Sequence, residues 1–141
     1  MKTSMILVMV LGLAFSTFAR AEETQAPDLR GIPNAEVLAP GVVNGGKPSD
    51  EGLVNLKNKG FRTVIDTRMP EEGTEEERKR VEGLGMTYVN IPMASRQATP
   101  AQAETLGELL QKDETYPVLL HCASGARSRV LWEAHQAELP Q

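Results

Sequence analysis

The chain has 141 residues, which is enough for one domain and too few for two of ordinary size. Hydrophobic residues make up 40% of the sequence but aromatic residues only 4%, so the core of a folded domain must be largely aliphatic. The formal net charge is −4 and the sequence has no basic run, which argues against nucleic acid as a partner.

The N-terminal segment has the parts of a secretory signal peptide. Lys2 gives a positive start, residues 5–15 form an apolar stretch too short to span a bilayer, and residues 19–21 form an Ala-Arg-Ala cleavage site. We predict cleavage after Ala21, a secreted or periplasmic location, and no stable membrane anchor afterwards. Loss of Lys2 and Arg20 lowers the net charge from −4 to −6, which disfavours polyanions as substrates and favours small anions.

Residues 22–35 are polar and contain two prolines, so we predict a flexible N-terminal lead before a domain over residues 36–141. This domain is expected to begin with two short strands, over residues 36–39 and 41–45, that are separated at Pro40.

Beyond these strands, helices and strands alternate. The predicted helices cover residues 50–59, 74–84, a segment that begins at Pro100, and 130–137; the predicted strands cover residues 61–66, 86–91 and 117–120. Ser49 caps the first helix, and the second begins with a capping box of Thr74 and Glu77. The many charges of the second helix indicate a solvated outer face.

Thr99 and Gln102 form a further capping box, before the helix that leads to the last strand. The alternation predicts an α/β fold with a mostly parallel sheet of four to five strands and helices on both faces. Ligands bind at the carboxyl ends of the strands in such sheets, where residues 67–73, 93–98 and 122–128 are expected to meet.

The segment from His121 to Arg129 carries the chemistry. It lies between the last strand and the last helix, and its tight loop contains Gly125. Such a loop directs backbone N–H groups and the positive end of a helix at one point, which makes an anion-binding site. Cys122 is the only cysteine, and both the helix N-terminus and Arg127 favour its thiolate. A thiolate beside an arginine fork is suited to attack on phosphorus or sulfur.

The alternative for a lone cysteine is inert packing, because free cysteine is often a small buried hydrophobe. Cys122 ends a strand instead of lying inside one, and Gly125 and Arg127 follow at short spacing. An unpaired cysteine in an exported protein also indicates a reactive thiol or an intermolecular link. We therefore favour a reactive thiol.

Four segments, over residues 43–49, 60–68, 91–93 and 121–128, together with Leu131 and Trp132, resemble the phosphatase-like domain of the beta-lactamase hydrolase-like family. The resemblance covers about residues 35–135. It implies the fold of the cysteine-based tyrosine and dual-specificity phosphatases.

The resemblance also implies roles. Cys122 would be the nucleophile, and the Arg127 guanidinium would bind two oxygens of the phosphoryl group. The residues of the phosphate-binding loop would be Ala123, Ser124, Gly125, Ala126, Arg127 and Ser128. Ser128 would hydrogen-bond the thiolate, although its position equally suits a helix N-cap. His121 would orient the loop, with Asp66 and Arg68 as further supporting residues.

The sequence departs from the phosphatase pattern in two ways. Four residues separate Cys122 from Arg127, where tyrosine phosphatases have five, and this spacing resembles that of rhodaneses, which carry a persulfide on the cysteine. Residues 94–98, where the fold usually carries its general acid, include no carboxylate. Asp66, Glu71 and Glu72 are substitutes, or else ordinary loop and strand-end charges. Loss of a positioned acid costs about 10²–10⁴ in rate.

Three functions stay open. The first is an exported, thiolate-dependent phosphatase that acts on a small phosphorylated substrate. The second is a rhodanese-type sulfurtransferase that takes sulfane sulfur and carries a persulfide on Cys122. The third is a non-catalytic oxyanion-binding or redox-sensing module. None of them calls for a cofactor, and no metal site is expected, because single histidines without nearby cysteines or paired acids do not bind metals.

Overall fold

The computed structural model describes residues 28–140. Five strands form one sheet in the order β1-β2-β5-β3-β4, and only the β1–β2 pair is antiparallel. The strands are β1 (Glu36–Ala39), β2 (Val42–Gly45), β3 (Thr63–Asp66), β4 (Thr87–Asn90) and β5 (Val118–His121). The predicted mostly parallel sheet is confirmed. The predicted signal peptide, residues 1–21, and residues 22–27 lie outside the described residues.

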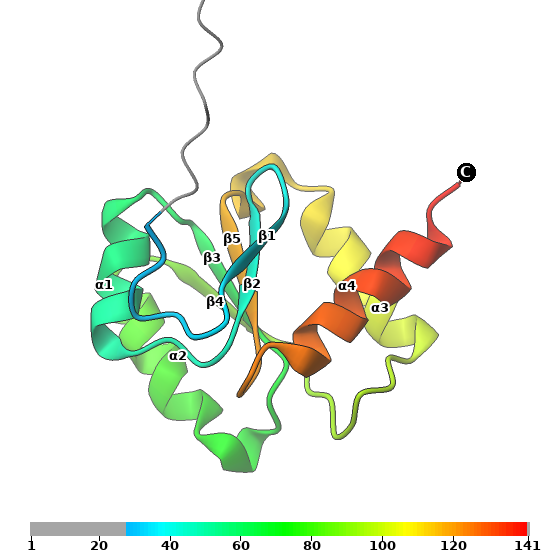
Figure 1. The fold of residues 1–141 in the computed structure, drawn as a ribbon, viewed down its shortest axis with the longest axis horizontal. Helices are drawn as coiled ribbons and strands as arrows, with labels where there is room; N and C mark the ends of the chain where they lie inside the picture. Colours follow the sequence, from blue (N-terminus) through cyan, green and yellow to red (C-terminus); the bar gives the residue numbers. More distant parts are fainter. Residues whose placement is uncertain (1–27, 141) are drawn as a thin grey trace, which may run out of the picture.

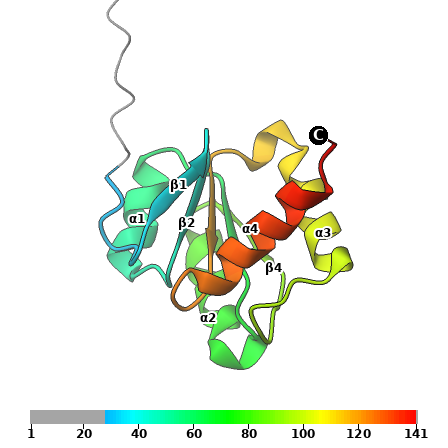
Figure 2. The same ribbon diagram turned by 45° about the vertical axis from the view of Figure 1, so that its right-hand side comes forward.

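Helices lie on both faces of the sheet, as the alternation predicted (Figure 1). They are α1 (Asp50–Asn58), α2 (Thr74–Gly83), α3 (Pro100–Leu110) and α4 (Ala126–Glu138), with the short 3₁₀ helices η1 (Pro70–Glu72) and η2 (Asp113–Thr115). Helices α1 and α2 cover one face, and α3 and α4 cover the other (Figure 2). None of the helices within residues 28–140 combines the length and the apolar character needed to cross a membrane.

Successive residues of the central strands face opposite layers and so build two cores. Leu119 of β5 packs with Leu53 and Leu56 of α1 on one face. Val118 and Leu120 pack with residues of α3 and α4 on the other face. The strands are therefore apolar on both sides, as expected for parallel strands between two helical layers.

Two predicted helix starts are confirmed. The Ser49 hydroxyl accepts the Gly52 N–H at 3.0 Å, and the side chains of Thr99 and Gln102 satisfy each other's backbone N–H groups.

Three expectations need correction. The Thr74–Glu77 capping box is wrong, because Gly73 is the N-cap of α2 and Glu77 is buried. Helix α4 begins at Ala126, four residues before the predicted start at residue 130. Residues 28–35 are not a flexible lead, because Ile32 belongs to the core and the Pro33 carbonyl accepts the Gly46 N–H at 2.7 Å.

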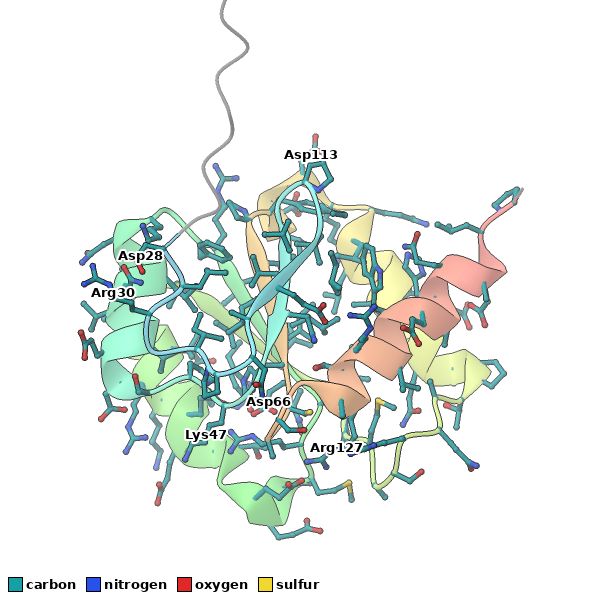
Figure 3. All side chains as sticks on the ribbon, in the orientation of Figure 1. Asp28, Arg30, Lys47, Asp66, Asp113 and Arg127 are labelled. Atoms are coloured by element: carbon teal, nitrogen blue, oxygen red, sulfur yellow. The ribbon has the colours of Figure 1, made fainter. Side chains whose placement is uncertain are left out.

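The carboxyl ends of β3 and β5 lie side by side, with Asp66 opposite His121 in the register. The Thr67 N–H donates to the His121 carbonyl at 2.8 Å, and the Met93 N–H donates to the Thr67 carbonyl at 2.9 Å. The three segments expected at this edge therefore meet there. In Figure 3, Asp66 and Arg127 lie at this end of the sheet, opposite Asp113.

Candidate active site

The loop of residues 122–125 is held against the ends of β2 and the segment that follows it. The Cys122 N–H donates to the Gly45 carbonyl at 3.4 Å, and the Lys47 N–H donates to the Ala123 carbonyl at 3.1 Å. Gly125 is the N-cap of α4 and has a φ of 96°, a conformation that favours glycine. A Cβ on Gly46 would lie 2.9 Å from the Ala123 carbonyl oxygen, so this close approach also needs glycine.

Cys122 is 1% exposed, and its Sγ accepts the Gly125 N–H at 3.1 Å. Burial raises the pKa of this thiol, but backbone N–H groups of Ser128, Ser124, Arg127 and Gly125 outweigh burial and lower the pKa to about 7. The thiol therefore lies at the N-terminal end of α4, where one backbone N–H bonds the sulfur and neighbouring amides favour the thiolate.

Arg127 lies at the mouth of this loop. Its Nη1 and Nη2 donate to the two carboxylate oxygens of Glu72 at 2.8 and 2.7 Å, and Nη1 also donates to the Met93 carbonyl at 3.0 Å. These contacts use three of the five guanidinium N–H donors and leave two for an anion. Hydrogen bonds to Glu72 raise the pKa of Arg127, and the Cys122 thiolate raises it further.

Arg129, the other arginine of the motif, does not join the site. It binds Glu36 and Glu133 instead. The arginine that closes the loop is therefore the one separated from Cys122 by four residues.

The Ser128 hydroxyl points to Asn44 and not to the thiol. It donates at 2.6 Å to Asn44 Oδ1 and lies 3.1 Å from the Gly125 carbonyl, and the Asn44 amide donates to that same carbonyl. The N-cap alternative for Ser128 is wrong, because Ser128 is the third residue of α4. Asn44, which the sequence did not indicate as a site residue, ties β2 to the end of the loop and to the first turn of α4.

Asp66, Arg68 and His121 lie in a buried polar cluster behind the loop. Arg68 donates to both oxygens of Asp66 and, at 2.6 Å, to Oε2 of Glu77. The Tyr88 hydroxyl also donates to Asp66, at 2.7 Å. Burial raises the pKa of Asp66, but the bonds from Arg68 dominate and hold it well below its usual range.

This cluster supports the site from behind and does not face the substrate side. Asp66 is fully buried, so it is not placed to protonate a leaving group. Glu72 is held as a carboxylate, because Arg127 lowers its pKa to about 2. Asp66, Glu77 and His121 have ligand atoms close enough for a metal, but the Arg68 guanidinium already bridges the two carboxylates. The donor set therefore fits a buried ion-pair network better than a metal centre.

Comparison with known proteins identifies the family of this chain. The family described as "DSP-PTPase phosphatase fused to NAD+ Kinase" matches residues 13–130. The chain belongs to this phosphatase family. A beta-lactamase hydrolase-like protein from Xylella fastidiosa is 26% identical over an alignment of 92 residues, which covers 62% of this chain and 21% of the relative. The chain thus spans about a fifth of that relative's length.

Solved structures show the same fold. A DUF442 protein from Shewanella putrefaciens CN-32 has a TM-score of 0.68 at 24% identity, covering 80% of this chain and 75% of its own. The catalytic domain of the PP-IP phosphatase SIW14 from S. cerevisiae has a TM-score of 0.58 at 16% identity, covering 67% and 58%. The phosphatase fold that the sequence resemblance implied is confirmed.

Proposed function

We propose that this family member is an exported phosphatase that uses Cys122 as its nucleophile on a small phosphorylated substrate. The observation that carries the proposal is the position of Cys122 Sγ, which accepts the Gly125 N–H at 3.1 Å at the N-terminus of α4, the helix that also carries Arg127. This arrangement ionises the thiol near neutral pH and offers donors to the oxygens of a phosphoryl group.

The proposed reaction has two steps. The Cys122 thiolate attacks phosphorus, so that an S–P bond forms while the bond to the leaving oxygen breaks, and that oxygen takes a proton from solvent. Water then attacks phosphorus, the S–P bond breaks, the water proton passes to solvent, and phosphate and the thiolate are released. In both steps, backbone N–H groups and Arg127 would stabilise charge on the equatorial oxygens.

The test is phosphate release from p-nitrophenyl phosphate by the wild type, Cys122→Ser and Arg127→Ala, with circular dichroism to check folding. We expect no activity from Cys122→Ser and a loss of at least about 100-fold from Arg127→Ala, because oxyanion donors are worth that much. Arg129→Ala is the matched control on the same helix and should stay within about threefold, because its ion pairs are exposed. Activity that survives in Cys122→Ser would refute the nucleophile.

A second candidate is sulfur transfer, which the four-residue spacing between Cys122 and Arg127 favours. Thiosulfate should then transfer its outer sulfur to the Cys122 thiolate and leave as sulfite, and cyanide should take that sulfur as thiocyanate and release the thiolate. The persulfide on Cys122 should be detectable by mass spectrometry. Binding of phosphate or sulfate without turnover of either substrate class would instead indicate a non-catalytic oxyanion-binding module.

Export is supported by the apolar stretch at residues 5–15 and the cleavage pattern before Glu22. N-terminal sequencing of protein from the periplasm or medium of a bacterial host should start at Glu22. Retention of the full chain in the cytoplasm would contradict export.

A further inference from the structure

A buried charged cluster lies directly behind Cys122, and the proposed chemistry does not use one of its members, Glu77. The cluster joins four elements: Asp66 ends β3, Glu77 comes from α2, Tyr88 from β4, and His121 ends β5. Arg68, just after β3, lies among them. All five side chains are buried, and Glu77 is 2% exposed although it belongs to the most highly charged helix.

With both acids of this cluster ionised, its charges balance when His121 is protonated. Asp66 and Glu77 supply two carboxylates, and Arg68 supplies one cation, with its Nη2 at 2.8 and 2.6 Å from them. His121 Nε2 lies 3.0 Å from Glu77 Oε2 and 3.7 Å from Asp66 Oδ2. An unbalanced buried charge is costly, so these carboxylates favour an imidazolium.

The two ring nitrogens of His121 have different neighbours. Nδ1 lies 3.1 Å from the Cys122 carbonyl oxygen, and Nε2 faces Glu77. Within residues 28–140, neither Nε2 nor Glu77 Oε1 has an aligned hydrogen-bond partner, and the 3.0 Å contact of Nε2 is with the other Glu77 oxygen, Oε2. A neutral ring carries one N–H, whereas the imidazolium carries two and can donate to the Cys122 carbonyl while it faces Glu77.

We propose that Glu77 is a positioning residue that keeps His121 protonated, so that the ring donates to the Cys122 carbonyl and favours the thiolate of the same residue. The proposal rests on the proposed function in one respect: the phosphatase reaction would be what the thiolate is used for. The imidazolium withdraws electron density from the carbonyl beside the sulfur and fixes the start of the loop. Burial alone would lower the pKa of His121, but Glu77 and Asp66 raise it.

The groups that face the His121 ring come from every element around it. Asp66 and Glu77 favour the imidazolium, Arg68 opposes it, and Tyr88 is neutral, because burial and Asp66 raise the pKa of its hydroxyl. The Cys122 thiolate also favours the imidazolium, so the thiol and the ring are expected to titrate as a coupled pair.

The first test is NMR of the imidazole nitrogens in the wild type. The chain has only two histidines, and a His135→Asn variant assigns the signals. We expect His121 to stay protonated through pH 7, with Nδ1 in a hydrogen bond. A neutral His121 at pH 6.5 in the wild type would overturn the proposal, and this result needs no Glu77 variant.

The second test uses Glu77→Gln, which keeps the shape of the side chain and removes its charge. Alkylation of the single cysteine by iodoacetamide, measured against pH, reports the thiol. The midpoint, near pH 7 in the wild type, should rise by about one unit, so that alkylation at pH 6.5 slows about tenfold. Glu76→Gln, an exposed neighbour on α2, is the matched control and should not move the midpoint.

If Glu77→Gln fails to fold, His121→Asn replaces it, because asparagine keeps a donor near Nδ1 without the charge. It should raise the alkylation midpoint by the same amount. An unchanged midpoint in a folded variant would overturn the proposal. Neither the NMR nor the alkylation measurement needs turnover. If the alkylation midpoint shifts in a protein that does not hydrolyse phosphate esters, the phosphatase assignment is refuted and the role of Glu77 is not.

Discussion

Glu72 gives a direct test of how Arg127 is held. Its two oxygens accept from the guanidinium at 2.8 and 2.7 Å, and Oε2 also accepts the Met69 N–H at 2.6 Å. Glu72→Gln keeps the shape but removes the charge and turns an NH₂ group toward an N–H donor. Both side chains are partly exposed, so the loss is about 1–2 kcal/mol, and kcat/KM for p-nitrophenyl phosphate should fall about 5- to 30-fold.

The pH dependence of this effect follows from the pKa of Glu72, which Arg127 lowers to about 2 from 4.5. A lowered carboxyl pKa stabilises the pair above the unfolded value, and this contribution is lost only as the pH falls through about 2. The ratio of wild-type to variant activity should therefore be constant from about pH 5 to 8. Glu71→Gln, its exposed neighbour, is the control. An increase in kcat/KM would refute the reasoning, because Glu72 would then compete with substrate for Arg127.

Three further predictions concern the loop. Gly125→Ala would place a Cβ 3.1 Å from the Gly45 carbonyl carbon at a φ of 96°, and urea titration should show a loss of about 1–2 kcal/mol. Asn44→Ala removes the acceptor that lies 2.6 Å from the buried Ser128 hydroxyl and should lower the free energy of unfolding by about 1–3 kcal/mol. In the double variant with Ser128→Ala, the loss of stability should be less than the sum of the two single losses. The Cys122 thiol has a pKa of about 7, which lies below the unfolded value of about 8.5. The stability that this thiol adds is therefore present above pH 8.5 and is lost as the pH falls through 7. The difference in unfolding free energy between wild type and Cys122→Ser should change by about 2 kcal/mol across this interval.

Local rules predicted the fold well where a few neighbouring residues decide it. Ser49 and the Thr99–Gln102 pair cap the helices that they were expected to cap. The capping-box rule failed at Glu77, because the buried Arg68 needs carboxylate partners and the Glu77 side chain of α2 forms an ion pair with it. The sequence held a signal for that outcome: Glu77 lies four residues before the buried Val81, on the same face of the helix.

The sequence predicted only the part of the candidate site that lies in one continuous segment. Cys122, Arg127 and the amides between them follow one another in the sequence, so their convergence follows from a strand, a loop and a helix. Asn44 and Glu72 come from other segments. Asn44 reaches the loop only because β2 pairs with β5, and the alternation of strands and helices does not fix that strand order.

The short spacing between Cys122 and Arg127 still leaves enough donors for a phosphoryl group. Arg127 is the second residue of α4, and helical side chains lean toward the N-terminus, so its guanidinium reaches back to the loop. The backbone amides of Ser124, Gly125, Arg127 and Ser128 lower the pKa of the Cys122 thiol, and the guanidinium has two donors left. This number suits the three equatorial oxygens of a phosphoryl transition state, which share its charge.

Orthovanadate, which adopts the five-coordinate geometry of that transition state, should therefore protect Cys122 from iodoacetamide far better than sulfate does. Transition-state analogues bind at least about 100-fold tighter than ground-state ligands, so the two half-protecting concentrations should differ by that factor or more. Equal protection by both anions would mean that the loop binds a tetrahedral charge only. The donors around Cys122 would then define an anion-binding site without the geometry for phosphoryl transfer.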